Sequence, residues 1–367
     1  MLIVSTQCFP PDLGGIENLM YSLCACLYEK GHDISVFADA GSAREDREFD
    51  RACGFQIHRY SGLKPWRRRK KAWNIARLAG ECNNSRLIAD SWKSLEHLDT
   101  TRFTRTICLA HGSELPLKPG QAKFARIRHS LAKAAVIIAN SQYTAGRVEN
   151  YTGPDERIHV IHPGINPPIV PDRAPAGTVK DRIGDSSPIL LSIARLEPRK
   201  GLDRVLRIMP QVLQRFPEAL YVIAGEGSLH PGLTRLAHEL RISEHVLFCG
   251  RLDEPLKSGY IECSDLFVLP GAESGNDVEG FGMVFLEAAI HGVPSITGRF
   301  GGAAEAVIHE QTGLVCEISS EKELADAVLT LLDNTPLRRR LGENARHRAR
   351  HFLWNSRIRD YEDLLFT

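Results

Sequence analysis

The fold is decided by residues 1–38, which read MLIVSTQCFPPDLGGIENLMYSLCACLYEKGHDISVFA. The apolar run from Leu2 to Thr6 predicts a strand, and the segment from Cys8 to Gly15, with its prolines and glycines, predicts a loop. Apolar residues then recur at near-helical spacing from Ile16 to Lys30, and a second apolar run covers Ile34 to Ala38. Because a strand, a helix and a further strand follow in this order, we expect a parallel, doubly wound α/β sheet.

The same alternation extends over the rest of the chain. In the first half, strands are predicted over 105–110 and 135–139, with a helix over 122–134. The second half predicts strands over 189–194, 219–224, 245–248, 265–269 and 294–297, helices over 202–216, 233–240 and 283–290, and a helical end from residue 321.

A proline-rich stretch without periodicity separates the two halves, from Pro163 to Pro188. We interpret it as the interdomain linker. The predicted organisation is a Rossmann-like domain over 1–170, a linker over 171–188 and a second Rossmann-like domain over 189–350. Ligands are expected in a cleft between the domains, beyond the carboxyl ends of the strands.

The composition excludes several classes of protein. The 367 residues suffice for two domains, and 46 Lys and Arg against 45 Asp and Glu lack the positive field of a dedicated nucleic-acid binder. No apolar run approaches the roughly 20 residues that span a bilayer. The nine cysteines are scattered, with Cys24 and Cys26 as the only close pair, which favours reduced thiols and a cytoplasmic protein.

Glycines after the first strand form one candidate site. At Gly14 and Gly15 the backbone amides can approach an anion, which the helix N-terminus also favours. The alternative is a turn that merely needs a positive φ. The GxGxxG pattern is absent here, and it fails again at Gly225-Glu226-Gly227, where His230 takes the third glycine position; this counts against a dehydrogenase.

A cationic loop after the first strand of the second domain is another candidate. Residues 194–201 read ARLEPRKG and carry Arg195, Arg199 and Lys200. A planar fork of donors together with a point charge suits a phosphate or diphosphate. The alternative is a solvated loop paired with Glu197.

The most specific candidate is the segment 277–287, which reads DVEGFGMVFLE. Glu279 lies in a glycine-bearing loop, where it can bind sugar hydroxyls, and Glu287 lies inside the following helix, where it can bind a ribose diol. The two glycines leave the amides of Met283 and Val284 to face an anion. The alternative, acids that flank a helix because of its dipole, explains Glu279 but not the glycines.

Two further candidates are a histidine and a glycine pair, and several common motifs are absent. His111 follows an apolar strand and is either a site residue or a structural histidine, and Gly301-Gly302 is a further glycine pair. The chain contains no D-x-D, H-E-x-x-H, G-x-S-x-G, Walker or CxxC pattern. Diphosphate charge would therefore be met by Arg195, Lys200 and backbone dipoles rather than by Mg²⁺, and neither a metal nor a cofactor is expected.

Together these segments resemble the retaining glycosyltransferases of family four, which have the GT-B fold. The matching segments are FPPDLGGIE (9–17), HG (111–112), NSQ (140–142), HPGIN (162–166), the cationic loop 195–201, GEG (225–227) and the E-x7-E segment 279–287. The resemblance implies two Rossmann-like domains that face a central cleft. Phe352 and Trp354 are similar to the family's C-terminal segment, so the helix over 351–367 is expected to cross back to the first domain.

The resemblance also implies an activity and roles for residues. A sugar passes from a nucleotide donor to a hydroxyl with its anomeric configuration retained, usually without a metal, and the departing diphosphate helps to take the acceptor proton. The implied catalytic residues are Glu279, His111, Arg195 and Lys200. The implied donor-binding residues are Gly14, Gly15, Arg195 and Lys200 for the diphosphate, Arg251 and Leu252 beside the base, Glu279 for the sugar, Glu287 for the ribose, and the backbone of Phe281, Gly282, Met283 and Val284.

The donor and acceptor are implied less closely. Segments 277–284 and 298–302 are most similar to members that use GDP-mannose on lipid acceptors, and a UDP-sugar donor is the alternative. The expected partners are a nucleotide sugar and a glycolipid or glycan acceptor. A nucleotide-sugar epimerase, a phosphorylase with a pyridoxal cofactor and a non-catalytic binding protein are the competing functions.

A basic run, KPWRRRKKAW over residues 64–73, places six cations among two tryptophans. Basic side chains with interfacial aromatics suit an anionic membrane surface, at roughly 1 kcal/mol per cation. We expect Lys64–Lys71 to give peripheral contact with the inner face of a membrane. No nucleic-acid recognition motif accompanies the run, and a solvated helix face above a buried tryptophan is the alternative.

Overall fold

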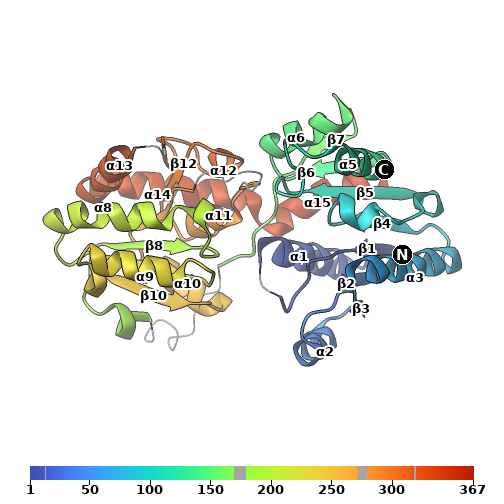
Figure 1. The fold of residues 1–367 in the computed structure, drawn as a ribbon, viewed down its shortest axis with the longest axis horizontal. Coiled ribbons are helices and arrows are strands. Elements are labelled where there is room, and N and C mark those ends of the chain that lie inside the picture. Colours follow the sequence, from blue (N-terminus) through green and yellow to red (C-terminus); the bar gives the residue numbers. More distant parts are fainter. Residues whose placement is uncertain (13, 169–178, 272–278, 318–319) are drawn as a thin grey trace. The chain divides into compact units, whose positions relative to one another are not determined.

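The computed structural model describes residues 1–12, 14–168, 179–271, 279–317 and 320–367. It consists of two compact units, each built on its own parallel sheet (Figure 1). The first unit comprises Met1–Asn166 and Phe352–Thr367, and the second comprises Pro167–His351. The predicted α/β class with two doubly wound, Rossmann-like domains is confirmed.

The first unit has, among the described residues, a seven-stranded sheet in the order β3-β2-β1-β4-β5-β6-β7. Its strand order reverses between β1 (Leu2–Ser5) and β4 (Arg86–Ala89), which are parallel with Ser5 opposite Ala89. The connections after these two strands leave in opposite directions, which opens a crevice at their carboxyl ends. Ligands of doubly wound sheets bind at such a point.

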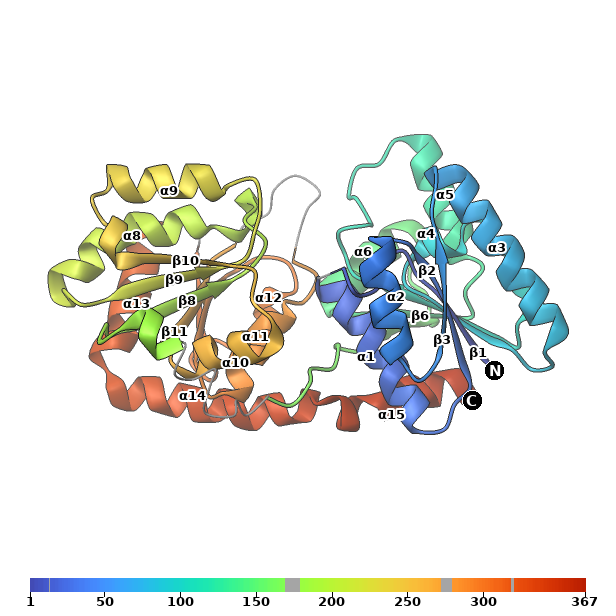
Figure 2. The same ribbon diagram turned by 90° about the horizontal axis from the view of Figure 1, so that it is seen from below.

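Helices lie on both faces of this sheet (Figures 1 and 2), so its central strands are buried and read as nearly continuous apolar runs. The remaining elements of the unit are α1 (Gly15–Glu29), β2 (Ile34–Asp39), α2 (Ala43–Ala52), β3 (Gln56–Tyr60), α3 (Lys64–Glu81), α4 (Trp92–Leu95), η1 (Thr100–Arg102), β5 (Arg105–Ala110), α5 (Gln121–Leu131), β6 (Val136–Ala139), α6 (Gln142–Thr152), β7 (Ile158–Val160) and α15 (Trp354–Phe366).

The second unit repeats the arrangement with a sheet in the order β10-β9-β8-β11-β12-β13, reversing between β8 and β11. Its elements are β8 (Ile189–Ile193), η2 (Pro198–Lys200), α8 (Leu202–Arg215), β9 (Leu220–Ala224), α9 (His230–Glu239), η3 (Ser243–His245), β10 (Val246–Gly250), α10 (Glu254–Glu262), β11 (Leu266–Leu269), α11 (Met283–Ile290), β12 (Ser295–Gly298), α12 (Ala303–Ala306), β13 (Gly313–Cys316), α13 (Glu321–Asp333) and α14 (Thr335–Ala349). Every strand and helix predicted from the sequence is present, with ends shifted by a few residues.

The last helix, α15, belongs to the first unit although it is the last element of the chain. It packs against α1 and β5. Backbone hydrogen bonds join Ile165 to Phe352 at 2.8 Å and Trp354 to Ile165 at 3.1 Å. The ring of Trp354 lies where a Cβ on Gly164 would be, so glycine is required there.

The boundary between the units lies after Asn166, a few residues before the expected linker over 171–188. Residues 171–178 lie outside the described residues, and the chain enters the second unit at Pro167. Residues 179–183 are helical, and the buried side chains of Val179 and Ile183 lie one turn apart. This part of the proline-rich stretch is therefore packed into the second unit rather than being a free connection.

Candidate active site

In the second unit, the candidate residues gather around the carboxylate of Glu279. Its Oε2 accepts hydrogen bonds from Lys200 Nζ at 2.5 Å and from Arg199 Nη1 at 2.9 Å. All three side chains are largely buried, with exposed fractions of 17% for Glu279, 10% for Lys200 and 9% for Arg199. Burial by itself raises the pKa of Glu279, but Lys200 and Arg199 lower it more, so the net pKa lies below that of an ordinary glutamate.

The fold places this cluster at the point where the strand order reverses. Arg199 and Lys200 form the turn η2 after β8, and Glu279 lies between the neighbouring strand β11 and helix α11. Gly201, with a φ of 67°, ends η2, and a Cβ at this position would lie 3.2 Å from the backbone nitrogen of Gly271. The positive φ of residue 201 and the close approach of the two loops both favour glycine there.

The glycine pair after β12 holds the backbone of Glu279. The amide of Gly302 donates to the carbonyl oxygen of Glu279 at 2.8 Å. Gly301 has a φ of 53°, and a Cβ there would collide with the same oxygen. This pair therefore positions Glu279. Asp277 and Val278, at the start of the same motif, lie outside the described residues.

The N-terminus of α11 presents backbone donors next to this cluster. Gly282 precedes the helix with a φ of 83°, and Phe281 is buried. Met283 and Val284 are the first two helical residues, and among the described residues no backbone carbonyl accepts from either amide. Such amides, with the helix dipole, suit a phosphate or another anion.

Glu287, further along α11, has a cationic partner that sequence reasoning missed. Its Oε1 lies 3.1 Å from Nζ of Lys257 on α10, and Glu254 approaches the same nitrogen at 2.9 Å. Burial by itself lowers the pKa of Lys257, but the nearby carboxylates of Glu287 and Glu254 raise it by more. The net pKa is therefore above that of an ordinary lysine, and the side chain is charged. No signal in the sequence pairs Lys257 with Glu287, because packing of α10 beside α11 brings them together.

The structure does not bring Arg195, Arg251 or Leu252 into the cluster around Glu279. Arg195 is 67% exposed and pairs with Glu197 at 3.0 Å, which is the alternative considered for the cationic loop. Arg251 is 57% exposed, with its Nε 4.0 Å from Glu226, and Leu252 is half-buried. Arg199, rather than Arg195, contacts Glu279 together with Lys200, because both belong to the η2 turn.

In the first unit, His111 follows β5 and is buried, with 8% of it exposed. Its Nε2 lies 2.9 Å from the carbonyl oxygen of Asp90, so in the neutral ring this nitrogen carries the hydrogen. Its backbone amide donates to Glu114 at 2.8 Å. The ring orientation is thus set by the loop after β4, and Nδ1 is left as the acceptor.

Gly14 and Gly15 lie at the N-terminus of α1, as the sequence indicated. Gly14 is extended, with a φ of 175°, so the alternative of a turn that needs a positive φ is wrong there. A Cβ on Gly14 would meet only the carboxylate of Glu17 in the first helical turn, which is the mobile end of a side chain. An anion bound here would require Glu17 to turn away.

The basic run forms the first half of α3, and its cations divide between two faces. Lys71 is buried and donates to Asp39 at 2.8 Å, and Arg67 pairs with the same carboxylate at 2.7 Å. Arg68 donates to Gln7 at 3.0 Å and lies 3.4 Å from Glu96. The run is therefore not a single solvated surface of six cations.

The opposite face of α3 is exposed and partly apolar. Trp66 and Trp73 are 72% and 63% exposed, so the alternative with a tryptophan buried beneath the helix is wrong. They share this face with Leu63, Lys70 and Arg77, at helical spacing. Among the described residues, no helix has both the length and the apolar character to cross a membrane.

Comparison with known proteins gives matches over almost the whole chain. Residues 178–348 match the family model for Glycosyl transferases group 1, and residues 13–168 match that for Glycosyltransferase Family 4. The chain is 31% identical over 357 residues to the GDP-mannose-dependent monoacylated alpha-(1-6)-phosphatidylinositol monomannoside mannosyltransferase of Corynebacterium glutamicum, covering 92% of this chain and 90% of the relative. It is 28% identical to the GDP-mannose-dependent alpha-(1-6)-phosphatidylinositol monomannoside mannosyltransferase of Mycolicibacterium smegmatis, covering 100% and 98%.

Solved structures are similar in fold over the full length. The crystal structure of Anabaena Alr3699/HepE in complex with UDP and glucose has a TM-score of 0.81 at 18% identity, covering 100% of this chain and 99% of that one. WaaG, a glycosyltransferase involved in lipopolysaccharide biosynthesis, has a TM-score of 0.71 at 19% identity with the same coverage.

Proposed function

Because this chain belongs to the family-four glycosyltransferases with the GT-B fold, and is thus a hexosyltransferase, we propose that it transfers mannose from GDP-mannose to a hydroxyl of a glycolipid. The observation that carries this choice of donor and acceptor is the similarity, over 92% of the chain, to a GDP-mannose-dependent mannosyltransferase named for a phosphatidylinositol mannoside.

The second unit supports the binding of the donor. Lys200 and Arg199, which share Glu279 at 2.5 and 2.9 Å, would turn to the diphosphate oxygens, and the amides of Met283 and Val284 would add dipoles. Glu279 would then accept hydrogen bonds from the mannose hydroxyls, and Glu287 from the ribose. Arg195 would have to leave Glu197 to join them.

We propose that transfer retains the anomeric configuration and needs no metal. The bond from the sugar C1 to the diphosphate oxygen breaks, the bond from C1 to the acceptor oxygen forms on the same face, and the acceptor proton passes to the departing diphosphate. Lys200, Arg199 and the start of α11 stabilise the negative charge that develops, which is the usual role of preorganised donors.

The test is to incubate the purified protein with a panel of GDP- and UDP-sugars and phosphatidylinositol mannoside acceptors. We expect GDP release and a mannosylated lipid with an α-linkage from GDP-mannose, unchanged by EDTA, and no turnover by Glu279→Ala. Transfer from UDP-sugars alone would support the UDP alternative, and an altered donor without acceptor would indicate an epimerase. Donor binding without turnover would indicate a binding protein.

We further propose that the exposed face of α3 holds the protein at the inner face of an anionic membrane. Trp66, Trp73 and Leu63 would enter the headgroup region, and Lys70 and Arg77 would meet anionic lipid. Vesicles containing phosphatidylinositol should sediment the wild type at low salt and release it at high salt. Trp66→Ser with Trp73→Ser should weaken this sedimentation, and sedimentation unchanged by both would exclude α3 as the contact.

A further inference from the structure

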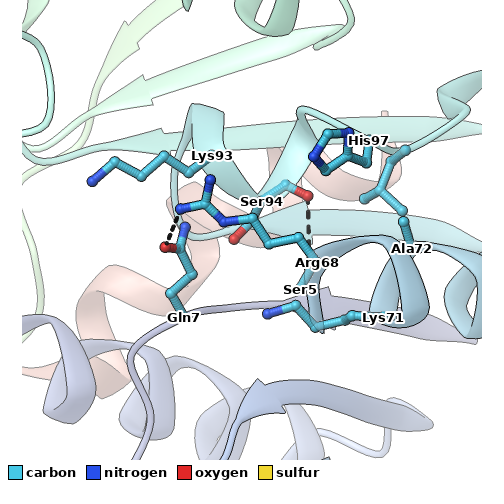
Figure 3. Close-up of a pocket in the computed structure, with 9 residues that line it drawn as sticks. Ser5, Gln7, Arg68, Lys71, Ala72, Lys93, Ser94 and His97 are labelled. Carbon is cyan, nitrogen blue, oxygen red and sulfur yellow. Dashed lines mark hydrogen bonds between the residues drawn. The ribbon is translucent and has the colours of Figure 1, made fainter. Parts of the chain in front are cut away.

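A small polar pocket lies in the first unit, at the β1/β4 reversal of the strand order. Figure 3 shows Gln7 and Arg68 in contact, with Lys93 beside them and its amino end directed away from both, and His97 on the far side of Ser94. The residues that line it are Ser5, Gln7, Arg68, Lys71, Ala72, Lys93, Ser94, His97 and Leu98. They come from the end of β1 and the loop after it, from α3, and from α4 and the residues that follow it, so the pocket occupies the place where doubly wound sheets bind ligands.

The pocket has more cationic groups than the neighbouring carboxylates can pair. Glu96, 3.4 Å from Arg68, is also held by Arg126 at 2.6 Å. Asp39, 2.8 Å from Lys71, is also held by Arg67 at 2.7 Å. Within the described part of the chain no carboxylate lies within ion-pair distance of the half-buried Lys93. The buried Nε of Arg68 also has no hydrogen-bond acceptor among the residues that the structure describes.

The third carboxylate of this region, Asp90, is occupied inside the protein. Its carboxylate oxygens accept hydrogen bonds from Thr6 Oγ1 at 2.8 Å, from the backbone amide of Gln7 at 2.7 Å and from Ser94 Oγ at 2.6 Å. The side chain is buried. Asp90 thus fixes the two loops that form the pocket, while its backbone oxygen orients His111. The site is preorganised before any ligand arrives.

We propose that this pocket binds the phosphate group of the acceptor, with Lys93 and Arg68 as its direct ligands. The inference rests on the proposed function, since it names the part of a phospholipid acceptor that the first unit recognises. The enclosed space has room for about one water molecule, so the phosphate would lie at its mouth and replace Gln7 as the partner of Arg68. The fork of Arg68 and the point charge of Lys93 suit phosphate oxygens.

The position of the pocket agrees with the rest of the unit. It is joined through Asp90 to His111, one of the expected catalytic residues, and it shares α3 with the exposed tryptophan face. A lipid whose headgroup enters beside α3 would thus bring its phosphate to Arg68 and Lys93 while its acyl chains stay with Trp66. The net pKa of His97 is lowered, so His97 adds no charge at neutral pH. Burial is the main cause, and Arg69 and Arg68 lower the pKa further, against the opposite effect of Glu96.

The experiment compares Lys93→Met with Lys70→Met, a matched lysine on the exposed face of α3. Transfer is measured to phosphatidylinositol mannoside in vesicles, to its deacylated water-soluble form and to a mannoside without phosphate. We expect Lys93→Met to raise the KM for both phosphate-bearing acceptors about tenfold or more, with no change for the neutral mannoside or in GDP-mannose affinity. Lys70→Met should affect only the vesicle substrate.

Measuring acceptor binding without turnover tests the phosphate pocket independently of the proposed mannosyl transfer. By calorimetry, the deacylated acceptor should bind the wild type more tightly than Lys93→Met or Arg68→Gln, and inorganic phosphate should compete with it. Binding lost in these variants without any mannosyl transfer would contradict the proposed function but support the pocket. Equal binding by all three proteins, or an increased KM for GDP-mannose in Lys93→Met, would overturn the pocket assignment.

Discussion

At the scale of single residues, Glu279 links the cationic turn η2 to the glycine pair that follows β12. Its side chain holds the two buried cations of η2, and its backbone oxygen is held by Gly302. In the absence of a donor, the carboxylate compensates the charges that a diphosphate would otherwise meet. Removing it therefore affects stability as well as turnover, and the two effects have different pH dependences.

Glu279→Gln should destabilise the second unit at pH 7 by about 2 kcal/mol or more, because Lys200 and Arg199 stay buried without their anion. The pKa of Glu279 is lowered in the folded protein. The stabilisation is thus present above the unfolded pKa of about 4.3 and is lost as the pH falls through the folded value. The difference in melting temperature between wild type and variant should therefore be nearly constant from pH 7 to about pH 5 and should shrink as the pH falls below about 4.3. Glu317→Gln, at an exposed pair with Arg299, is the control, and a pH-independent difference would contradict the prediction.

Gly301→Ala should reduce kcat/KM at least tenfold, because the added Cβ collides with the backbone oxygen of Glu279. The matched control is Gly184→Ala. Gly184 has a φ of 59°, close to the 53° of Gly301, but nothing lies within 4 Å of its added Cβ. Both variants should lose about 1 kcal/mol to backbone strain, and only Gly301→Ala should lose activity. Equal activities would show that Gly302 suffices to hold Glu279.

At the level of secondary-structure elements, both units use the loops that follow neighbouring strands at the reversal of the strand order. The clear apolar runs allowed most of these strands to be predicted from the sequence. Strands β3, β4, β7 and β13 were not predicted. Strands β3 and β7 are mostly half-exposed and lack a continuous apolar pattern, and β4 and β13 are runs of only four residues. Helix α3 was recognised as a basic run, but its division into a pocket-lining face and an exposed face depends on which side meets the sheet.

The pairing of α10 with α11 gives a prediction at this scale. Lys257→Met should leave Glu287 without its partner and shift its position, so the KM for GDP-mannose should rise about tenfold with a smaller change in kcat. Lys322→Met is the control, since Lys322 is 83% exposed and pairs with Asp326 within α13. If the donor KM is the same in Lys257→Met and wild type, Glu287 does not contribute to donor binding.

For the whole molecule, the chain passes from the first unit to the second and returns for its last helix. The first unit therefore depends on residues distant in sequence, because α15 covers α1 and β5. Arg86 and Arg105 also donate to the carbonyl oxygens of Leu365 and Leu364, at 2.9 and 3.0 Å. Its fold is complete only when helix α15 is in place.

Tyr361→Ala, at a buried position of α15, should destabilise the first unit by about 3 kcal/mol. Hydrogen exchange should then become faster in β1, β5 and α1 but not in the strands β8 to β13. Asn355→Ala, on the exposed side of the same helix, should leave both units unchanged. Faster exchange in the second unit would show that α15 stabilises both.

The sequence by itself determined the doubly wound class, the two domains, and most of the loops that carry the candidate residues, because buried parallel strands and helix N-termini leave local patterns. Only the tertiary structure decided that Arg199 rather than Arg195 joins Lys200 at Glu279, that Lys257 pairs with Glu287, and that three of the six cations of the basic run 64–73 turn inward. These outcomes depend on which side chains meet across elements far apart in sequence. Local spacing does not encode that choice, which follows from burial and charge pairing in the folded chain.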